Sequence, residues 1–517
     1  RSTGVCRGKG GSMHLAEPSV GLVSTNAIVA GHIPMAGGVA LSAKLRATRQ
    51  VVLCFFGDGA ANQGTFHESA NMAGAWNLPI IYFIENNQYA VGTSIREVSA
   101  IQDLYRRASS YNMDGLVVDG MDPVAVYNAV SESAERIRSG GGPCIIEAKC
   151  YRRYHHAGIR VGSALGYRPK EEEAEWLAKE AVYTFPRRLV ETGVMDESGV
   201  ECLRQKANEL VSRAVDHCTE PGSPRKVRTE LWPRPEAITK GLRSDGGEWA
   251  GVRFSEREDF KNWTEMRFSD AIAAVTGRWL ENDLTAFVMG EEVANFGGGA
   301  YGATKGLPAK YPNRVLNTPI SEAGFVGMSC GAALAGMKPI VEIMFGDFAL
   351  VAADQLFSQI AKTRHMYGGK TDVPLVARTR VGVGCGYGGQ HSMDPVALYA
   401  LFPGWRIVYP SDAFDYIGLF NSAMTSLDPV VLIEHQQLYA QKFPVPKGEL
   451  DYLISFDKAR VVAQGDQLTM IGYGSTIARC LTVREALAGE GVSAEVIDLR
   501  TVDLPGIDYA TIGESVK

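Results

Sequence analysis

The sequence places a carboxylate and an amide just after two apolar runs. Asp58 follows the run 51–56 within a Gly-Asp-Gly turn, and Asn87 follows the run 78–84, twenty-nine residues later. Tyr89 comes two residues further on and offers its backbone carbonyl. Carboxylate, amide and carbonyl oxygens suit Mg²⁺, which protein sites often share with phosphates. Either motif alone is an ordinary turn or loop, but the pair at this spacing predicts a magnesium–diphosphate site.

The elements that must position these residues follow a strand–helix–strand rhythm. Three strands are predicted, at 51–59, 78–87 and 142–150. The segment 61–76 between the first two predicts a helix with Phe66, Ala70 and Ala73 on one narrow apolar face. This order predicts parallel βαβ units, with the diphosphate at a helix N-terminus after the first strand.

The rhythm restarts after a charged helical region at 171–218. A helix is predicted at 268–283, with Ser269 or Asp270 as its N-cap. Strands are predicted at 285–293, 338–345, 373–381, 405–410, 429–435, 467–475 and 493–500. Two α/β halves of similar size are therefore expected.

Composition limits the class of protein. The chain has 517 residues, 45% of them hydrophobic, and a formal net charge of −6, so no basic surplus predicts a nucleic-acid partner. No apolar run is long enough to span a membrane, and the first residues lack the apolar core of a signal peptide. The nine cysteines show no CxxC pair, which predicts reduced thiols and a cytoplasmic location. The chain begins and ends as though it were cut from something longer.

Several motifs together resemble a known family. The GDG…NN pair is similar to the thiamin-diphosphate motif, and GKGGSMH at 8–14 and AIVAGHIPMAGGVAL at 27–41 resemble the α subunit of the first component of 2-oxo acid dehydrogenase complexes. The second half resembles the β subunit, through GEEV at 290–293, NTPISEAGFVG at 317–327, DQ at 354–355 and GGQHS at 388–392. The chain thus resembles an α–β fusion.

The resemblance implies an α/β fold with two parallel-sheet domains of the thiamin-diphosphate-binding type and a partial transketolase C-terminal-like domain. The expected segments are an α-like diphosphate-binding domain at 1–218, a Pro-rich linker at 219–262, a β-like pyrimidine-binding domain at 263–447 and the partial domain at 448–517.

The resemblance also implies roles for individual residues. Asp58, Asn87 and the Tyr89 carbonyl would bind Mg²⁺. Glu322 would hydrogen-bond the aminopyrimidine ring and thereby activate the cofactor. The remaining implied cofactor contacts are Ala27, Val29, Gly59, Ala60, Glu291, Ile320 and Phe348. Ala27 replaces a common glycine, which requires that its φ stay negative.

Two histidines are implied to act on the substrate. His156 aligns with a histidine of a flexible, phosphorylated loop in the family, and His391 with a histidine near the β-subunit substrate. Either can gain or lose a proton near neutral pH. Ala157 stands where regulated relatives carry the phosphorylated serine, and Val351 where some pyruvate-specific relatives carry glutamine. We therefore expect no phosphorylation control at this loop.

The implied function is thiamin-diphosphate- and Mg²⁺-dependent cleavage of a short 2-oxo acid or acetoin. The acyl group would pass to a lipoyl group on a dihydrolipoyl acyltransferase, and the fused chain would form a homodimer. A two- to four-carbon acyl product is expected.

Three alternatives stay open. A transketolase-like C2 transfer is the nearest. A nicotinamide-dependent oxidoreductase is suggested by GCGYGG at 384–389, which fits G-x-G-x-x-G. A non-catalytic assembly subunit is the third, although Asp58, Asn87 and Glu322 are all present.

Overall fold

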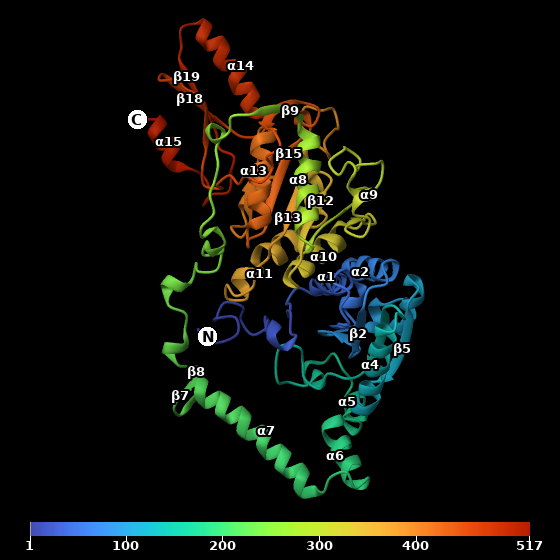
Figure 1. The fold of residues 1–517 in the computed structure, drawn as a ribbon. Coiled ribbons are helices and arrows are strands. Elements are labelled where there is room, and N and C mark those ends of the chain that lie inside the picture. Colours follow the sequence, from blue (N-terminus) through green and yellow to red (C-terminus); the bar gives the residue numbers. More distant parts are fainter. Residues whose placement is uncertain (1) are drawn as a thin grey trace. The chain divides into compact units, whose positions relative to one another are not determined.

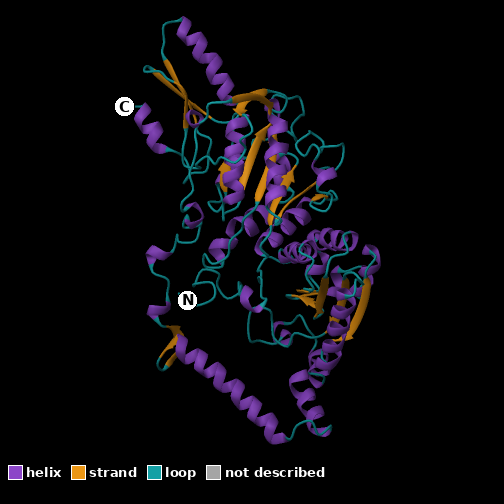
Figure 2. Ribbon diagram, viewed as in Figure 1, coloured by secondary structure: helices purple, strands orange, loops and turns teal. Residues whose placement is uncertain are grey.

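The structure is a computed structural model that describes residues 2–517. Its contacts divide the chain into two units, each described by itself (Figures 1 and 2). Unit 1 comprises Thr25–Ile238 and the residues up to Leu15. Unit 2 comprises Ala16–Ser24 and Thr239–Lys517.

Unit 1 is built on a four-stranded parallel sheet with the order β1-β2-β6-β5. The strands are β1 (Val52–Gly57), β2 (Ile80–Asn86), β5 (Asp114–Asp119) and β6 (Cys144–Lys149). The predicted strands at 51–59, 78–87 and 142–150 are confirmed, and β5 was not predicted.

Helices cover the two faces of this sheet. They are α1 (His32–Leu45), α2 (Gly64–Ala75) and α4 (Pro123–Arg138). On one face, Ile81, Phe83 and Ile146 form a core with apolar residues of α4. On the other face, the Ser69 hydroxyl of α2 lies 3.0 Å from the Tyr82 hydroxyl of β2. The predicted apolar face of α2 is confirmed, since Phe66, Ala70 and Ala73 are buried together with Met72 and Ser69.

The charged region after the sheet is helical, as predicted. It contains α5 (Lys170–Ala178), α6 (Ala181–Glu191) and α7 (Glu197–Cys218), followed by the short strands β7 (Thr219–Glu220) and β8 (Ser223–Val227). The small elements β3 (Tyr89–Ala90), β4 (Thr93–Ser94) and α3 (Ile95–Val98) follow β2.

Unit 2 contains a six-stranded parallel sheet with the order β11-β10-β12-β13-β15-β14. The strands are β10 (Ala286–Gly290), β11 (Val315–Asn317), β12 (Lys338–Ile343), β13 (Val376–Val381), β14 (Arg406–Val408) and β15 (Val430–His435). The helices are α8 (Phe268–Asn282), α9 (Leu307–Lys310), α10 (Glu322–Leu334), α11 (Ala361–Met366), α12 (Val396–Ala400) and α13 (Ala413–Thr425). Apolar residues of α8 and α13 pack on this sheet in one large core.

The predicted cap of α8 is wrong. The N-cap residue is Arg267, without a side-chain hydrogen bond, and the helix begins at the fully buried Phe268. The backbone N–H groups of Phe268 and Ser269 donate to the carbonyls of Gln441 (2.9 Å) and Tyr439 (3.3 Å). Backbone carbonyls near β16 (Lys442–Pro446), which pairs with β9 (Trp263–Arg267), therefore replace the expected side-chain cap.

The last residues form a small α/β layer. Strand β19 (Ala494–Asp498) lies between β18 (Leu468–Gly472), which is parallel to it, and β17 (Arg460–Ala463), which is antiparallel. Helix α14 (Thr476–Gly489) packs on this sheet, and α15 (Tyr509–Ser515) follows.

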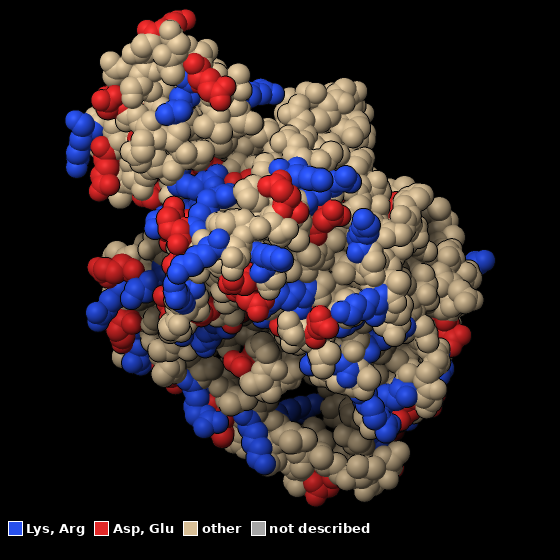
Figure 3. Space-filling model, turned by 45° about the horizontal axis from the view of Figure 1, so that its top comes forward, with Lys and Arg blue, Asp and Glu red and all other residues tan. Residues whose placement is uncertain are grey.

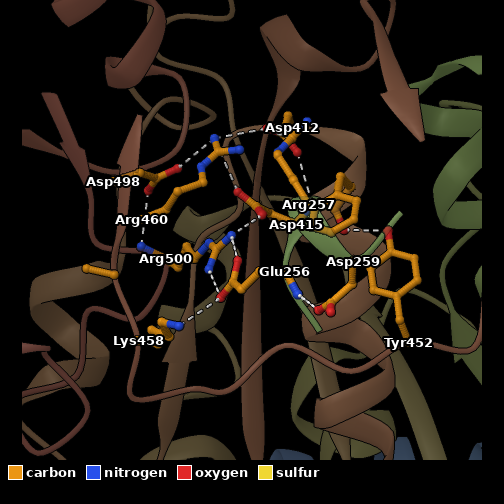
Figure 4. A network of polar contacts seen from close by, with 12 residues as sticks. Glu256, Arg257, Asp259, Asp412, Asp415, Tyr452, Lys458, Arg460, Asp498 and Arg500 are labelled. Carbon is orange, nitrogen blue, oxygen red and sulfur yellow. Dashed lines mark hydrogen bonds and ion pairs between the residues drawn. The ribbon is translucent and has the colours of Figure 1, made fainter. Parts of the chain in front are cut away.

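A buried polar network joins this layer to α13 (Figure 4). The Arg500 guanidinium donates to Asp415 at 2.8 Å and to both Glu256 oxygens at 2.9 Å. Arg460 pairs with Asp412 at 3.0 Å, and its charge partly offsets the burial that raises the pKa of Asp498 to about 7. Four separate stretches of chain are thus fixed by one set of charges.

All nine cysteines are free thiols. Within residues 2–517, no helix combines the length and the apolar character needed to cross a bilayer. On the face seen in Figure 3, basic and acidic side chains are interspersed.

Candidate functional site

Asp58 lies at the carboxyl end of β1 and is buried, with 3% of its surface exposed. Burial raises the pKa of its carboxyl. Three groups oppose that rise in pKa: its own backbone N–H, the positive charge of Arg152 and the backbone N–H of Asn87. Asp58 and Asn87, which the sequence separates, therefore meet at one sheet edge, as parallel strands require.

The two asparagines at the carboxyl end of β2, Asn86 and Asn87, have different roles. Asn86 is buried and donates to the Glu147 carboxylate at 2.6 Å. Glu147 also accepts from the backbone N–H of Tyr105 at 2.9 Å, so it holds the end of β2 in place. Asn87 keeps its side-chain oxygen for the site, where it accepts a 3.3 Å hydrogen bond from the Tyr89 N–H.

A guanidinium lies against the oxygens that were predicted to bind Mg²⁺. Arg152 donates to Asn87 Oδ1 at 3.4 Å, to the Tyr89 carbonyl at 3.1 Å and to the Val91 carbonyl at 2.6 Å. These oxygens therefore attract a cation, and with the buried Asp58 carboxylate they fit the preferences of Mg²⁺. In residues 2–517 no three His, Cys, Asp or Glu side chains cluster as a metal site, so a metal here depends on the amide and carbonyl oxygens.

Arg168 orders this part of the site. Its guanidinium lies 4.5 Å from the ring centroid of Tyr89, 4.4 Å from that of Tyr151 and 5.2 Å from that of Tyr167. It also donates a hydrogen bond to the Arg152 carbonyl. Stacking of this kind holds both Tyr89 and the start of the following loop.

The residues after Asp58 form a tight turn. Gly59 precedes a short 3₁₀ turn, Ala60–Asn62, and α2 begins only at Gly64. A Cβ on Gly59 would lie 2.7 Å from the Cβ of Ala90, so this position has no room for a side chain. The backbone N–H groups predicted to face a diphosphate therefore belong to a 3₁₀ turn and not to the first turn of α2.

The segment before α1 meets the condition set for Ala27. Ala27 is not among the non-glycine residues with positive φ, whereas Ala30 has φ 68°. Ala27 is half-buried and Val29 is exposed.

In unit 2, two carboxylates come close together. Glu322 is the first residue of α10, Glu291 directly follows β10, and both are buried. Burial and the negative charge of Glu322 raise the pKa of Glu291 to about 7. One oxygen of Glu291 is buried without a hydrogen-bond partner, which leaves a polar atom available to a ligand.

The unit also brings His391 and Phe348 together. Their ring centroids are 5.2 Å apart, and both rings contact Phe345, at 4.8 Å from His391 and 5.9 Å from Phe348. Ile320 is exposed, as is Val351. In unit 1, His156 lies exposed on the loop after β6, next to the exposed Ala157.

The dinucleotide-binding alternative lacks its structural context. Residues 382–395, which contain the GCGYGG segment, form turns and bends, and the next helix is the five-residue α12. The G-x-G-x-x-G motif needs a helix N-terminus directly after its glycines to hold a pyrophosphate.

Three models of known protein families match successive parts of this chain. Residues 1–226 match the model of the dehydrogenase E1 component, residues 264–442 that of the transketolase pyrimidine binding domain, and residues 457–517 that of the transketolase C-terminal domain. The chain is 43% identical over 256 residues to the pyruvate dehydrogenase E1 component subunit beta, mitochondrial, of Dictyostelium discoideum, covering 49% of this chain and 71% of that subunit.

The chain belongs to the family of dehydrogenase E1 components. It is also 44% identical over 216 residues to subunit alpha of the acetoin:2,6-dichlorophenolindophenol oxidoreductase of Bacillus subtilis, covering 42% of this chain and 63% of that subunit. This E1 chain thus joins α-like and β-like parts, as the motifs implied.

A solved structure confirms the predicted fold class. The transketolase of Campylobacter jejuni superposes with a TM-score of 0.63 at 15% identity, covering 94% of this chain and 72% of that one. At this identity the likeness shows the fold alone.

Sequence reasoning missed several residues that shape the site of this E1 chain. Arg152 and Glu147 were not singled out, although a glutamate in an apolar strand and a basic pair after it are visible signals. Arg168 and Phe345 gave no signal, because their roles depend on aromatic neighbours that are distant in the sequence.

Proposed function

We propose that this chain is a thiamin-diphosphate- and Mg²⁺-dependent E1 dehydrogenase component that cleaves a short 2-oxo acid or acetoin. The observation that carries the proposal is that Asp58, Asn87 and the Tyr89 carbonyl lie around the positive charge of Arg152, in a chain of this family. These oxygens would hold Mg²⁺. The N–H groups of Gly59 and Ala60 would face the diphosphate.

Unit 2 would hold the ring of the cofactor. Glu322 would bind the aminopyrimidine ring nitrogen. Glu291, Ile320 and Phe348 would contact the cofactor, as would Ala27 and Val29 of unit 1. When bound, thiamin diphosphate supplies the nucleophilic carbon that attacks the donor's carbonyl.

The proton transfers of the reaction would be carried out by side chains of the chain itself. A buried carboxyl such as Glu322 can exchange a proton with a ring nitrogen, a contribution typically worth about 10²–10⁴ in rate. Glu291, with a pKa of about 7, can hold a proton at neutral pH and so limit repulsion from Glu322. His391, which packs on Phe345 and Phe348, would meet the substrate, and the exposed His156 would act on it from its loop.

The proposal extends to partners. The acyl product would be transferred to a lipoyl group on a dihydrolipoyl acyltransferase, and two fused chains would form a homodimer. The free cysteines support a reducing compartment such as the cytoplasm.

The experiment that tests this function is a donor panel with thiamin diphosphate and Mg²⁺. Pyruvate, 2-oxobutyrate and acetoin are offered with 2,6-dichlorophenolindophenol as electron acceptor, and ketose phosphates with an aldose acceptor. Dye reduction with the first group supports the proposal. Transfer of a two-carbon unit between sugars without dye reduction would favour the transketolase-like alternative.

A further inference from the structure

Arg380 is a buried cation whose charge has no ion-pair partner among residues 2–517. It lies near the carboxyl end of β13, and only 2% of its surface is exposed. Its Nε donates to the Met344 carbonyl at 3.0 Å, whereas Nη1 and Nη2 are buried without a hydrogen-bond partner. Guanidinium stays charged at any pH that a protein experiences, so these donors cannot be removed by deprotonation.

The neighbouring carboxylate is already occupied. Glu434 accepts from Arg378 at 2.7 and 3.0 Å, from the Tyr416 hydroxyl at 2.8 Å and from the Tyr439 hydroxyl. Arg378, two residues before Arg380 on β13, is therefore fully paired, in contrast to Arg380.

Two aromatic rings partly stabilise the charge of Arg380. The Arg380 guanidinium carbon lies 3.3 Å from the ring centroid of Tyr301 and 4.9 Å from that of Phe345. Ring faces attract a cation, but they accept no strong hydrogen bond from the two terminal nitrogens. Because an unsatisfied buried donor is costly, the arrangement indicates an acceptor that binds there.

Arg380 lies close to His391, the histidine that is proposed to meet the substrate. Phe345 contacts both the guanidinium and the imidazole of His391, whose ring centroid lies 4.8 Å from its own. Tyr387, which also packs on Phe345 at 5.4 Å, is 40% exposed. The cation thus lies behind a partly exposed aromatic cluster that includes His391.

We infer that Arg380 is a specificity-determining residue that binds the carboxylate of a 2-oxo acid donor. The inference rests on the proposed function and specifies its donor. The planar guanidinium fork matches a planar carboxylate and leaves no strong interaction for the neutral donor acetoin. It also supplies a charged anchor in a chain that carries the exposed Val351 where some relatives carry glutamine.

The test compares Arg380→Met with the parent chain on two donors. With thiamin diphosphate, Mg²⁺ and the indophenol dye, the KM for pyruvate should rise about 10- to 100-fold, which is the usual range for a lost charge-assisted hydrogen bond. The KM and kcat for acetoin should stay within about twofold of the parent values. Arg380→Lys keeps the positive charge but loses the planar group that donates two parallel hydrogen bonds, so it should recover part of the pyruvate affinity.

Binding of oxamate, an unreactive isostere of pyruvate, gives a readout that does not depend on turnover. Calorimetry should show oxamate binding to the parent and a loss of at least tenfold in affinity in Arg380→Met. The control is Lys362→Met, which removes one positive charge from an exposed site of the same unit and should change neither readout.

The outcomes separate this inference from the proposed function. A parent chain that turns over neither donor contradicts the proposed function, and oxamate binding in the two chains then decides the role of Arg380 alone. Equal loss with pyruvate and acetoin, together with lower thermal stability, would mean that Arg380 only packs against Tyr301 and Phe345, and would overturn the inference. Unchanged kinetics with an altered oligomeric state would also overturn it, because the acceptor would then come from a second copy of the chain.

Discussion

The guanidinium of Arg152 donates a 3.1 Å hydrogen bond to the carbonyl oxygen of Tyr89. The sequence had assigned that same oxygen to Mg²⁺. A guanidinium and a metal ion on the same oxygen would place two positive charges side by side. Mg²⁺ binding should therefore release Arg152 from Tyr89 and Asn87. The released side chain would then lie beside the proposed diphosphate, where its charge is favourable.

Replacement of Asp58 should abolish metal-dependent cofactor binding. Asp58→Ala removes the only carboxylate of the proposed Mg²⁺ site, so thiamin diphosphate affinity should fall at least 100-fold in the presence of Mg²⁺. Isothermal titration calorimetry measures this directly. Asp114→Ala, at the exposed start of β5, is the control and should bind as the parent does. Equal affinity in Asp58→Ala and the parent would refute the metal assignment.

Glu322→Gln should separate binding from activation. The amide keeps the size of the side chain, so cofactor affinity should change by less than about tenfold, whereas turnover should fall about 10²–10⁴-fold. The rate at which the thiazolium proton of the bound cofactor exchanges with deuterium, followed by NMR after acid quench, reports activation alone. A variant that exchanges this proton at the parent rate would exclude the role.

Glu291 should make the stability of the cofactor-free chain depend on pH. Its pKa rises from 4.5 to about 7 on folding, so the folded state holds the extra proton and loses stability as the pH rises from 4.5 to 7. Glu291→Gln imitates the protonated form. It should therefore be more stable than the parent at pH 8, by about 1 kcal/mol or 1–2 °C in Tm, and equal to it near pH 4.5. Thermal unfolding at both pH values measures the difference, and a variant that is less stable at pH 8 contradicts it.

Arg500 should stabilise the C-terminal layer. Arg500→Met leaves Asp415 and Glu256 without their buried partner, and such a loss costs about 3–5 kcal/mol. Adding Asp415→Asn to that variant should recover part of the loss, because it removes one uncompensated charge. Lys458→Met, an exposed neighbour 4.0 Å from Glu256, is the control and should cost less than about 1 kcal/mol. Equal Tm values for Arg500→Met and the control would show that the network does not hold this layer.

Local patterns predicted the features that depend on local sequence. The apolar runs fixed β1, β2 and β6, and the polar residues after them placed Asp58 and Asn87 at one sheet edge, because parallel strands share that edge. The cap of α8 was not predictable in this way, since its donors bind carbonyls more than 150 residues away. Strand β5 was missed because its surface is mostly exposed and it lacks a continuous apolar run.

Contacts between distant residues account for the other misses. Arg152, Arg168 and Arg380 gain their roles from aromatic rings and backbone oxygens brought together only by folding. The sequence neighbours of Arg168 and Arg380 carry no matching signal, so these two arginines are equally consistent with an ordinary charged surface.

Oxidation of a short 2-oxo acid or acetoin with thiamin diphosphate and Mg²⁺ is the activity that we propose for this chain. The most direct measurement is the rate of 2,6-dichlorophenolindophenol reduction by pyruvate and by acetoin, with each cofactor added alone and both together. We expect saturable dye reduction only when both cofactors are present, and its loss in Asp58→Ala. Dye reduction that is independent of thiamin diphosphate, or no reduction by any short donor in a chain that calorimetry shows to have bound the cofactor, would rule out the proposed activity.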